Sequence, residues 1–352
     1  MHADVRIVGP KGSAEIGPPG VLIHEVSTKP LWWFLFSALI KSSILSMRWR
    51  PDVVLGGSGL VGPIVFMVAK LRGSLSAVYT HGLDLAIQHR FYRLLWLPFI
   101  ARANLILVNS QATRKLANSA GAEERQIRLI YPGTNVPPLL SASEIAKKKL
   151  IFRREMGVGE GPLLLSVGRL TQRKGLREFV RDVLPIIIGK FPDAIFLIIG
   201  EEPRHALHAE AQSRESIQAA ADSAGIGLSI RFGGVITDRT ALSVAYLAAN
   251  LHVFPVRDLP GDPEGFGMVA IEAAAHGLAT LAYRTGGVAD AVADGVSGIL
   301  IDPRDADSFA SAAIALLNQP LDPNGAREHA KQFAWERVGE RLAQELLYSQ
   351  IA

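Results

Sequence analysis

The sequence predicts an α/β protein built from two parallel, doubly wound sheets. Three observations lead to this prediction. Short apolar runs alternate with stretches of helical composition, which is typical of βαβ units. The runs fall into two successive series along the chain, and a length of 352 residues suits about two domains.

The first series of expected strands consists of VRIV, VLIHEV, DVVLGG, LSAVYTHG, LILVNS and IRLIYPG. The second consists of PLLLSVGRL, AIFLIIGEE, SIRFGGV, LHVFPV, LATLAYRTGG and GILIDP. Between them lies a segment rich in small residues and cations, which is typical of a solvated linker. We therefore expect an N-terminal α/β domain at 1–140, a linker at 141–160, a second α/β domain at 161–335 and a helix at 336–352. This last helix is expected to pack back on the N-terminal domain.

Composition narrows the class of protein. The chain is 49% hydrophobic and lacks cysteine, which excludes disulfides, thiolate metal sites and cysteine nucleophiles and fits a reducing cytoplasm. Its longest early apolar run, LWWFLFSALI at 31–40, stops at Lys41 and is too short to span a bilayer, which takes about 20 residues. We expect a cytoplasmic protein that does not cross a membrane.

The charges are unevenly distributed. Residues 1–157 hold 20 Lys and Arg against 9 Asp and Glu, whereas residues 158–352 hold 17 against 24. A basic half can attract nucleic acid, anionic lipid head groups or a phosphorylated acceptor. No nucleic-acid recognition motif accompanies the charge, so a nucleic-acid partner is not expected.

Ligands of open parallel sheets bind beyond the carboxyl ends of the strands. The stretch SVGRLTQRKGL at 166–176 places Arg169 and Lys174 around such a strand end, with Gly168 beside them. Two cations that converge there suit a diphosphate. The alternative is a surface turn with two solvated cations.

Two glycine-containing turns can offer backbone amides to an anion. YRTGGVADAV at 283–292 contains a strand end, the pair Gly286 and Gly287, and the start of a helix, where free amides favour phosphate. EGFG at 264–267 offers the same arrangement before the next helix. For a lone glycine pair, a plain tight turn is the more frequent explanation.

Two carboxylates stand eight positions apart in EGFGMVAIE. Glu264 follows the expected strand LHVFPV, where it can accept hydrogen bonds from sugar hydroxyls, and Glu272 lies in a helix, where it can accept two from a ribose diol. The alternatives are a charge partner of the helix N-terminus for Glu264 and a partly exposed helix position for Glu272.

Together, GRLTQRKG and EGFGMVAIE resemble the two signatures of the family 4 glycosyltransferases, which are retaining enzymes of the GT-B fold. RPDVVLGGSG, VYTHGLD, LVNSQAT and IYPGTNV are similar to the family's N-terminal strand-end loops. The resemblance runs from about Asp4 to the C-terminal helix. It is strongest to bacterial mannosyltransferases that act on lipid-linked acceptors, and it implies two Rossmann-like domains facing across a cleft.

The resemblance also implies residue roles. Arg169 and Lys174 would bind the diphosphate and stabilise it as it leaves, and His81 would sit at the reaction centre, although an isolated histidine is more often structural. Glu272 would hold the ribose, and Glu264 the transferred sugar. The implied catalytic residues are His81, Arg169, Lys174 and Glu264. The implied donor-binding residues are Gly168, Arg169, Lys174, Glu264, Gly265, Phe266, Gly267, Glu272 and Gly287.

No metal or other cofactor is expected, because preorganised cations and amides can stabilise the departing charge. The one Asp-x-Asp pair, Asp305 with Asp307, is better explained by helix capping. The expected function is transfer of a hexose, with mannose from GDP-mannose favoured over UDP-sugars, to a lipid-linked or polysaccharide acceptor. A dinucleotide oxidoreductase is a weak rival, because no G-x-G-x-x-G follows an expected strand.

The chain departs from the family at its N-terminus. The strand, glycine-rich loop and helix that usually precede the segment similar to MHADVRIVGP are not found in this sequence, so the N-terminal domain is expected to be shortened. A nucleotide-sugar-binding protein with little turnover is therefore an alternative function. Clustered aromatic residues and cations predict peripheral association with the anionic inner face of the plasma membrane, with core packing of the tryptophans as the alternative. They are Trp32, Trp33, Lys41, Arg48, Trp49 and Arg50.

Overall fold

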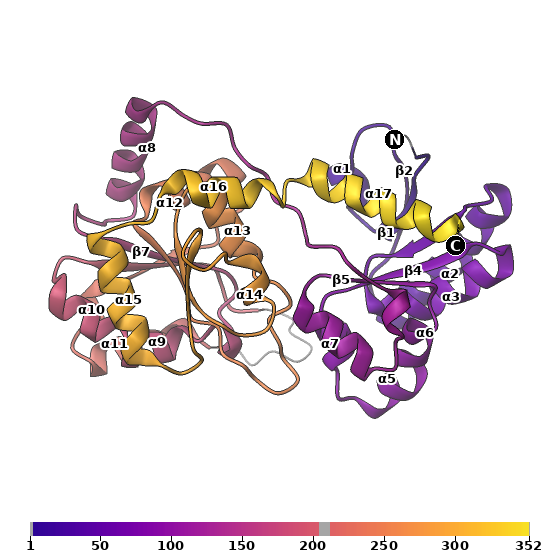
Figure 1. Ribbon diagram of the computed structural model, residues 1–352, viewed down its shortest axis with the longest axis horizontal. Coiled ribbons are helices and arrows are strands. Elements are labelled where there is room, and N and C mark those ends of the chain that lie inside the picture. Colours follow the sequence, from indigo (N-terminus) through magenta and orange to yellow (C-terminus); the bar gives the residue numbers. More distant parts are fainter. Residues whose placement is uncertain (1–2, 204–211, 352) are drawn as a thin grey trace. The chain divides into compact units, whose positions relative to one another are not determined.

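The computed structural model describes residues 3–203 and 212–351 and divides into two compact units. Unit 1 comprises residues 1–130 and 339–352, and unit 2 comprises residues 131–338 (Figure 1). Each unit contains parallel strands connected by helices, so the predicted fold class is confirmed. The last residue of the predicted C-terminal helix, Ala352, lies outside the described residues.

Unit 1 contains two parallel sheets, with strand orders β1-β2 and β3-β4-β5-β6. Its strands are β1 (Arg6–Pro10), β2 (Leu22–Val26), β3 (Val53–Gly56), β4 (Leu75–Thr80), β5 (Leu105–Val108) and β6 (Ile127–Leu129). Its helices are α1 (Ser13–Ile16), α2 (Leu31–Arg48), α3 (Gly62–Arg72), α4 (Leu83–Ala86), α5 (Arg90–Leu95), α6 (Leu97–Ala101) and α7 (Gln111–Ser119).

A small apolar core joins the helices of unit 1 to its first strands. Ala38 of α2 and Val68 of α3 are buried in one cluster with Val26 of β2, and α2 contacts both α3 and β1. Residues 339–351, the last part of α17 (Trp335–Ile351), also belong to this unit, and Glu345 forms a 2.8 Å ion pair with Arg128. None of the described helices is long and apolar enough to cross a membrane.

Unit 2 contains one parallel sheet of six strands in the order β12-β11-β10-β7-β8-β9. The strands are β7 (Leu163–Val167), β8 (Ile195–Ile199), β9 (Ile230–Gly234), β10 (Leu251–Phe254), β11 (Thr280–Tyr283) and β12 (Gly298–Ile301). The helices are α8 (Ala142–Glu155), α9 (Leu176–Asp182), α10 (Leu184–Lys190), α11 (Arg214–Ser223), α12 (Arg239–Ala248), α13 (Met268–Ala275), α14 (Val288–Ala291), α15 (Ala306–Asn318) and α16 (Pro323–Lys331).

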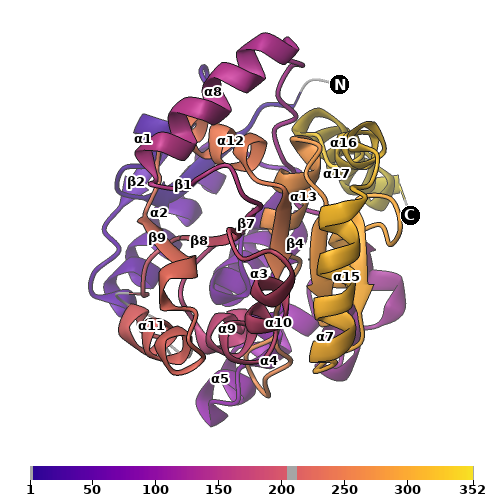
Figure 2. The same ribbon diagram turned by 90° about the vertical axis from the view of Figure 1, so that its left-hand side faces the viewer.

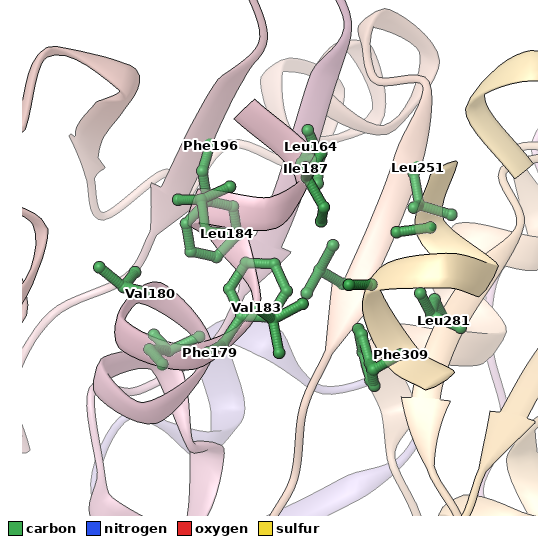
Figure 3. Packing of buried hydrophobic residues seen from close by; sticks show 14 of the residues in the cluster. Leu164, Phe179, Val180, Val183, Leu184, Ile187, Phe196, Leu251, Leu281 and Phe309 are labelled. Atoms are coloured by element: carbon green, nitrogen blue, oxygen red, sulfur yellow. The ribbon is translucent and has the colours of Figure 1, made fainter. Parts of the chain in front are cut away.

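Helices cover both faces of this sheet (Figure 2). Successive side chains of a strand point to opposite faces, so Leu164 packs against α9, α10 and α15, whereas Leu163 and Leu165 pack toward α8 and α12. Figure 3 shows the first of these cores, in which the ring centroid of Phe179 lies 4.9 Å from that of Phe196. Burial on both faces explains why the strands consist of continuous apolar runs.

The segment expected to be a linker, residues 141–160, contains a helix that belongs to unit 2. Helix α8 begins with a capping box in which Ser141 and Glu144 bond each other's backbone amides, and Phe152 is buried against the α12 side of the sheet. The cationic run of Lys147, Lys148 and Lys149 lies within this helix. The division between the units falls at residue 131 instead.

Candidate functional site

The first predicted cations lie in the turn that follows β7. Gly168 leaves the strand with a φ of 142°, and a short 3₁₀ turn at Gln172–Lys174 places the end of Lys174 in a mostly buried position. The turn then lies against the loop after β10, since a Cβ at Gly175 would be 2.2 Å from the carbonyl oxygen of Pro255. Only glycine permits this approach, and it brings residues 173 and 174 beside residues 262–264.

Four charged side chains pack together at this place. Lys174 Nζ donates to Glu264 Oε2 at 2.7 Å, and Arg173 Nε lies 3.2 Å from the same oxygen. Arg173 Nη1 donates to Asp262 Oδ1 at 2.5 Å and to the carbonyl oxygen of Pro263 at 3.1 Å. All four side chains are at most 13% exposed. The cluster is therefore a desolvated ionic network whose geometry is fixed by the protein.

The charges of the network support one another. Burial opposes ionisation of Glu264, but Lys174 and Arg173 outweigh it and hold the pKa of this carboxyl below its usual range. Burial lowers the pKa of Lys174, and the contact with Glu264 acts in the opposite direction. Lys174 Nζ also lies 4.6 Å from the ring centroid of Phe254, where a cation is attracted to the ring. We infer that Glu264 is an anion and that Lys174 is a cation held against it.

The glycine pair after β11 supports the loop that carries Glu264. The amide of Gly287 donates to the carbonyl oxygen of Glu264 at 2.9 Å, and a Cβ at Gly287 would lie 2.1 Å from the carbonyl oxygen of Gly265. The sequence suggested a free amide for phosphate at this position. Because that amide is already bonded within the protein, Gly287 shapes the loop through close backbone contact instead.

Phe266 fixes the same loop by packing its side chain into the core of unit 2. Its side chain is 2% exposed and packs against Tyr131 and Phe333, with ring centroids 5.4 and 5.6 Å away. Gly267, with a φ of 98°, then leads into α13. The loop is thus fixed at Phe266 and at Glu264, and Gly265 lies between these two positions.

Glu272 lies in the second turn of α13 and is only partly exposed. The hydroxyl of Tyr246, on α12, donates to Glu272 Oε2 at 2.8 Å. Burial raises the pKa of Glu272, and the bond from Tyr246 opposes that rise. Glu272 therefore has a hydrogen-bond partner within the protein.

His81 follows β4 in unit 1 and is exposed. Its Nε2 lies 2.9 Å from the carbonyl oxygen of Gly57, which can only accept, so Nε2 carries the proton and Nδ1 is the acceptor. The amide of His81 donates to Asp84 Oδ2 at 3.1 Å, and the rings of His81 and Tyr79 lie 4.7 Å apart. The imidazole is therefore held in one orientation and one tautomer.

The structure brings most of the predicted residues into one region of unit 2. Lys174 and Glu264 are in direct contact, and Gly168 and Arg169 precede them in the same turn. Arg169 is exposed and makes no ion pair with any residue in 3–203 or 212–351, yet its charge acts on both Lys174 and Glu264. Arg169 is accordingly the cation of this site that an anionic ligand can engage most directly.

Sequence reasoning missed Arg173, Asp262 and Tyr246. Arg173 directly precedes the predicted Lys174, but its pairing with Asp262 joins positions 89 residues apart. Tyr246 reaches Glu272 from another helix. The sequence signal for Arg173 was its place in the turn that carries the predicted diphosphate ligands Arg169 and Lys174. No sequence signal pointed to Tyr246.

Acidic and histidine side chains do not gather into a metal-binding group of three or more anywhere in the described ranges. Asp305 accepts a hydrogen bond from the amide of Ser308 at 3.0 Å and caps α15, as the sequence predicted. The site beside β7 and β10 is therefore formed by paired charges and backbone turns.

The two parallel α/β units have the architecture of GT-B glycosyltransferases. Residues 148–334 match the family described as glycosyl transferases group 1, and residues 2–136 match that described as Glycosyltransferase Family 4. The chain belongs to the group 1 glycosyl transferases.

Curated relatives agree with this family. One is D-inositol 3-phosphate glycosyltransferase of Geodermatophilus obscurus, 30% identical over 69% of this chain and 52% of its own length. Another is the GDP-mannose-dependent alpha-(1-6)-phosphatidylinositol monomannoside mannosyltransferase of Mycolicibacterium smegmatis, 26% identical over 69% of this chain and 62% of its own length. The chain thus spans about half to three fifths of the length of these relatives.

Solved structures share the fold. Sucrose-phosphate synthase from Thermosynechococcus elongatus is 21% identical with a TM-score of 0.74, over 95% of this chain and 84% of that one. Anabaena HepE in complex with UDP is 16% identical with a TM-score of 0.77, over 98% and 100%. At these identities the likeness establishes the fold.

Proposed function

We propose that this protein is a retaining hexosyltransferase that uses a nucleotide diphosphate sugar. The observation that carries the proposal is the buried pair of Lys174 and Glu264 beside the exposed cation Arg169, at the carboxyl ends of β7 and β10. Cations at such an edge suit a diphosphate, and a carboxylate fixed next to them suits sugar hydroxyls. Glu272 supplies an acceptor for the ribose.

The chemistry of transfer matches these groups. The bond between the anomeric carbon and the diphosphate oxygen breaks as the acceptor hydroxyl attacks that carbon. The hydroxyl proton passes to the departing oxygen, and negative charge grows on the departing diphosphate. Lys174 and Arg169 stabilise this charge from fixed positions, which lowers the barrier. Because no carboxylate is clearly placed as a nucleophile, we favour attack on the same face as departure, with retention and without a covalent intermediate.

The favoured donor is GDP-mannose, and the favoured acceptor is lipid-linked or a polysaccharide. The motifs of this chain are similar to those of bacterial mannosyltransferases, and one curated relative is named as GDP-mannose-dependent. UDP-sugars are the second choice, since a structural neighbour was solved with UDP-glucose. Metal is not required, because the protein supplies the cations.

A panel of ligands tests this function. Ligands that bind the native state raise the melting temperature by mass action, so GDP, UDP or their sugar conjugates should stabilise the protein, whereas NAD should not. Hexose transfer from the stabilising donor should continue in EDTA. Stabilisation by NAD alone would contradict the glycosyltransferase proposal.

The ionisation of Glu272 predicts how donor binding depends on pH. An ionised carboxylate accepts both ribose hydroxyls, and burial raises the pKa of Glu272, so affinity should fall as pH decreases toward 5 from neutrality. We expect calorimetric titration of GDP-mannose to show this loss in the wild type. Its diphosphate diester does not titrate in this range, and burial lowers the pKa of His276, which favours its neutral form.

Glu272→Gln is the control for this measurement. The variant should bind the donor more weakly at neutral pH, and its affinity should no longer depend on pH. Tyr246 and Arg239 still face the side chain, so its surroundings are otherwise kept. A wild-type curve that is flat between pH 5 and 8, or one that Glu272→Gln reproduces, would show that this carboxylate does not hold the ligand.

Helix α2 supports peripheral binding to an anionic membrane surface. Its cations Lys41 and Arg48 are exposed, and so is the nearby Arg50. At least 40% of the side-chain surface is exposed in seven apolar residues: Leu31, Trp32, Trp33, Phe36, Ile40, Ile44 and Met47. Large apolar side chains beside cations suit the interface of an anionic bilayer. Trp49 differs from the exposed tryptophans of α2, because it makes contacts within the protein. Its indole nitrogen donates to Asp4 at 3.0 Å, and its ring lies under Arg6.

We expect the protein to sediment with phosphatidylglycerol-containing liposomes at low salt and to be released at high salt. Trp32→Ser combined with Phe36→Ser should reduce the bound fraction at least about tenfold, because insertion of each ring contributes about 2 kcal/mol. The control is Leu228→Ser, which removes an 86% exposed side chain from unit 2. Equal sedimentation of both variants would contradict membrane docking through α2.

A second candidate function is nucleotide-sugar binding with little turnover. It is favoured by the division of the unit 1 strands into two separate sheets, β1-β2 and β3-β4-β5-β6. The two functions separate in a product assay run with the donor that the protein binds. The second candidate predicts saturable donor binding without hexose transfer, and multiple turnovers on a glycan or lipid-linked acceptor would contradict it.

A further inference from the structure

Tyr246 is buried, and its hydroxyl makes a hydrogen bond to a carboxylate. It lies in the third turn of α12, is 2% exposed, and directs its hydroxyl at Glu272 Oε2 over 2.8 Å. We propose that Tyr246 is a positioning residue that holds the Glu272 carboxylate in place for the ribose diol of the nucleotide. This inference rests on the proposed function and adds a residue to the same site.

The tyrosine is itself held by a second contact between the helices. His276 Nδ1 lies 2.7 Å from the carbonyl oxygen of Glu272, so this nitrogen donates. His276 Nε2 therefore accepts, and it does so from Ser243 Oγ of α12 at 2.6 Å. The imidazole also stacks on the ring of Tyr246, with centroids 5.2 Å apart and planes inclined by 21°. The imidazole of His276 thus connects the two helices through its hydrogen bonds, and the ring of Tyr246 packs against this fixed imidazole.

This arrangement leaves Glu272 able to bind a ligand. An ionised carboxylate has about four acceptor positions, and the hydroxyl of Tyr246 occupies one of them. Glu272 is partly exposed, whereas its neighbours in the helix, Ile271 and Ala273, are fully buried. A flexible glutamate would lose rotamer freedom on binding a diol, and a bond from a rigid tyrosine removes that freedom beforehand.

A purely structural role for Tyr246 predicts a different result. A buried tyrosine hydroxyl needs a hydrogen-bond partner in any protein, and under a purely structural role Glu272 meets only that need. In that case loss of the hydroxyl alters binding of every nucleotide equally. If Tyr246 acts through Glu272 on the ribose, the effect depends on the 2′-hydroxyl of the ligand.

The test is a cycle of two ligands and two proteins. Dissociation constants are measured by calorimetry for GDP and 2′-deoxyGDP, and for UDP and 2′-deoxyUDP, with the wild type and with Tyr246→Phe. For the base that the wild type binds, we expect Tyr246→Phe to weaken the ribonucleotide about tenfold and the deoxynucleotide less than twofold. Tyr283→Phe is the matched control, a tyrosine of β11 that is 9% exposed and packs on Phe309, and it should change neither constant.

A second variant keeps the test independent of folding. In a Glu272→Gln background, the further change Tyr246→Phe should leave the ribonucleotide constant within about twofold, because the two residues act as one unit. Equal weakening of both ligands by Tyr246→Phe, or no weakening, overturns the inference while nucleotide binding stands. Failure of the wild type to bind either nucleotide overturns the proposed function and the inference with it.

Discussion

Lys174→Met should lower kcat for hexose transfer by about 100- to 1000-fold, because it removes a fixed cation from the departing diphosphate. Methionine is unbranched and only one atom shorter than lysine, and it can pack on Phe254, over whose ring Lys174 Nζ now lies. Glu264 retains a cationic neighbour, since Arg173 Nε is 3.2 Å away. The fold should therefore tolerate the change while transition-state stabilisation is lost.

Steady-state kinetics with the donor identified by thermal shift measure this effect. Lys190→Met, which removes an exposed lysine at the end of α10, is the matched control and should leave kcat unchanged. Circular dichroism should show that both variants are folded. A decrease of less than threefold in Lys174→Met would mean that the leaving group is not stabilised at this position.

Glu264→Gln should lower the free energy of unfolding by about 3 kcal/mol at pH 7, the scale seen when one partner of a buried ion pair is removed. The glutamine leaves Lys174 and Arg173 with one anion, Asp262. The side chains of the four-residue ionic network are at most 13% exposed, so water cannot replace the lost charge. Denaturant titration followed by tryptophan fluorescence measures the change.

The difference between wild type and Glu264→Gln should depend on pH with a defined sign. The pKa of Glu264 is lowered in the folded state, so its stabilisation is fully present above the ordinary glutamate pKa. The stabilisation should fade as pH falls through the lower folded value, and the two proteins should converge in acid. The exposed Glu328→Gln serves as the control and should leave stability unchanged at pH 7. Divergence of wild type and Glu264→Gln on acidification would contradict the assigned pKa direction.

Local patterns predicted much of this fold. Apolar runs such as PLLLSVGRL are strands because both faces of the unit 2 sheet are covered, and the two-series organisation appears as two units. Within the predicted linker, Ala142–Glu155 form a helix instead, because Ser141 and Glu144 precede the cations of residues 147–149. Those two residues form a capping box, whose spacing is visible in the sequence and marks a helix start.

The candidate site was predictable only in part. Lys174 and Glu264 belong to local patterns, and their contact follows from the strand order, which places β7 beside β10. The partners that complete the site come from distant positions. Asp262 reaches Arg173 across 89 residues, and Tyr246 reaches Glu272 across two helices. Such pairings depend on how distant loops and helices pack together, which no local pattern encodes.

The most direct test of the central claim is calorimetric titration of GDP, UDP and NAD into the wild type, Lys174→Met and Glu272→Gln. If the carboxyl edge of the unit 2 sheet is a nucleotide-sugar site, one nucleoside diphosphate binds the wild type saturably, and both variants bind it more weakly. NAD then shows no saturable binding. Binding of NAD alone, or nucleoside diphosphate binding that neither substitution changes, would place the ligand elsewhere and contradict the proposed site.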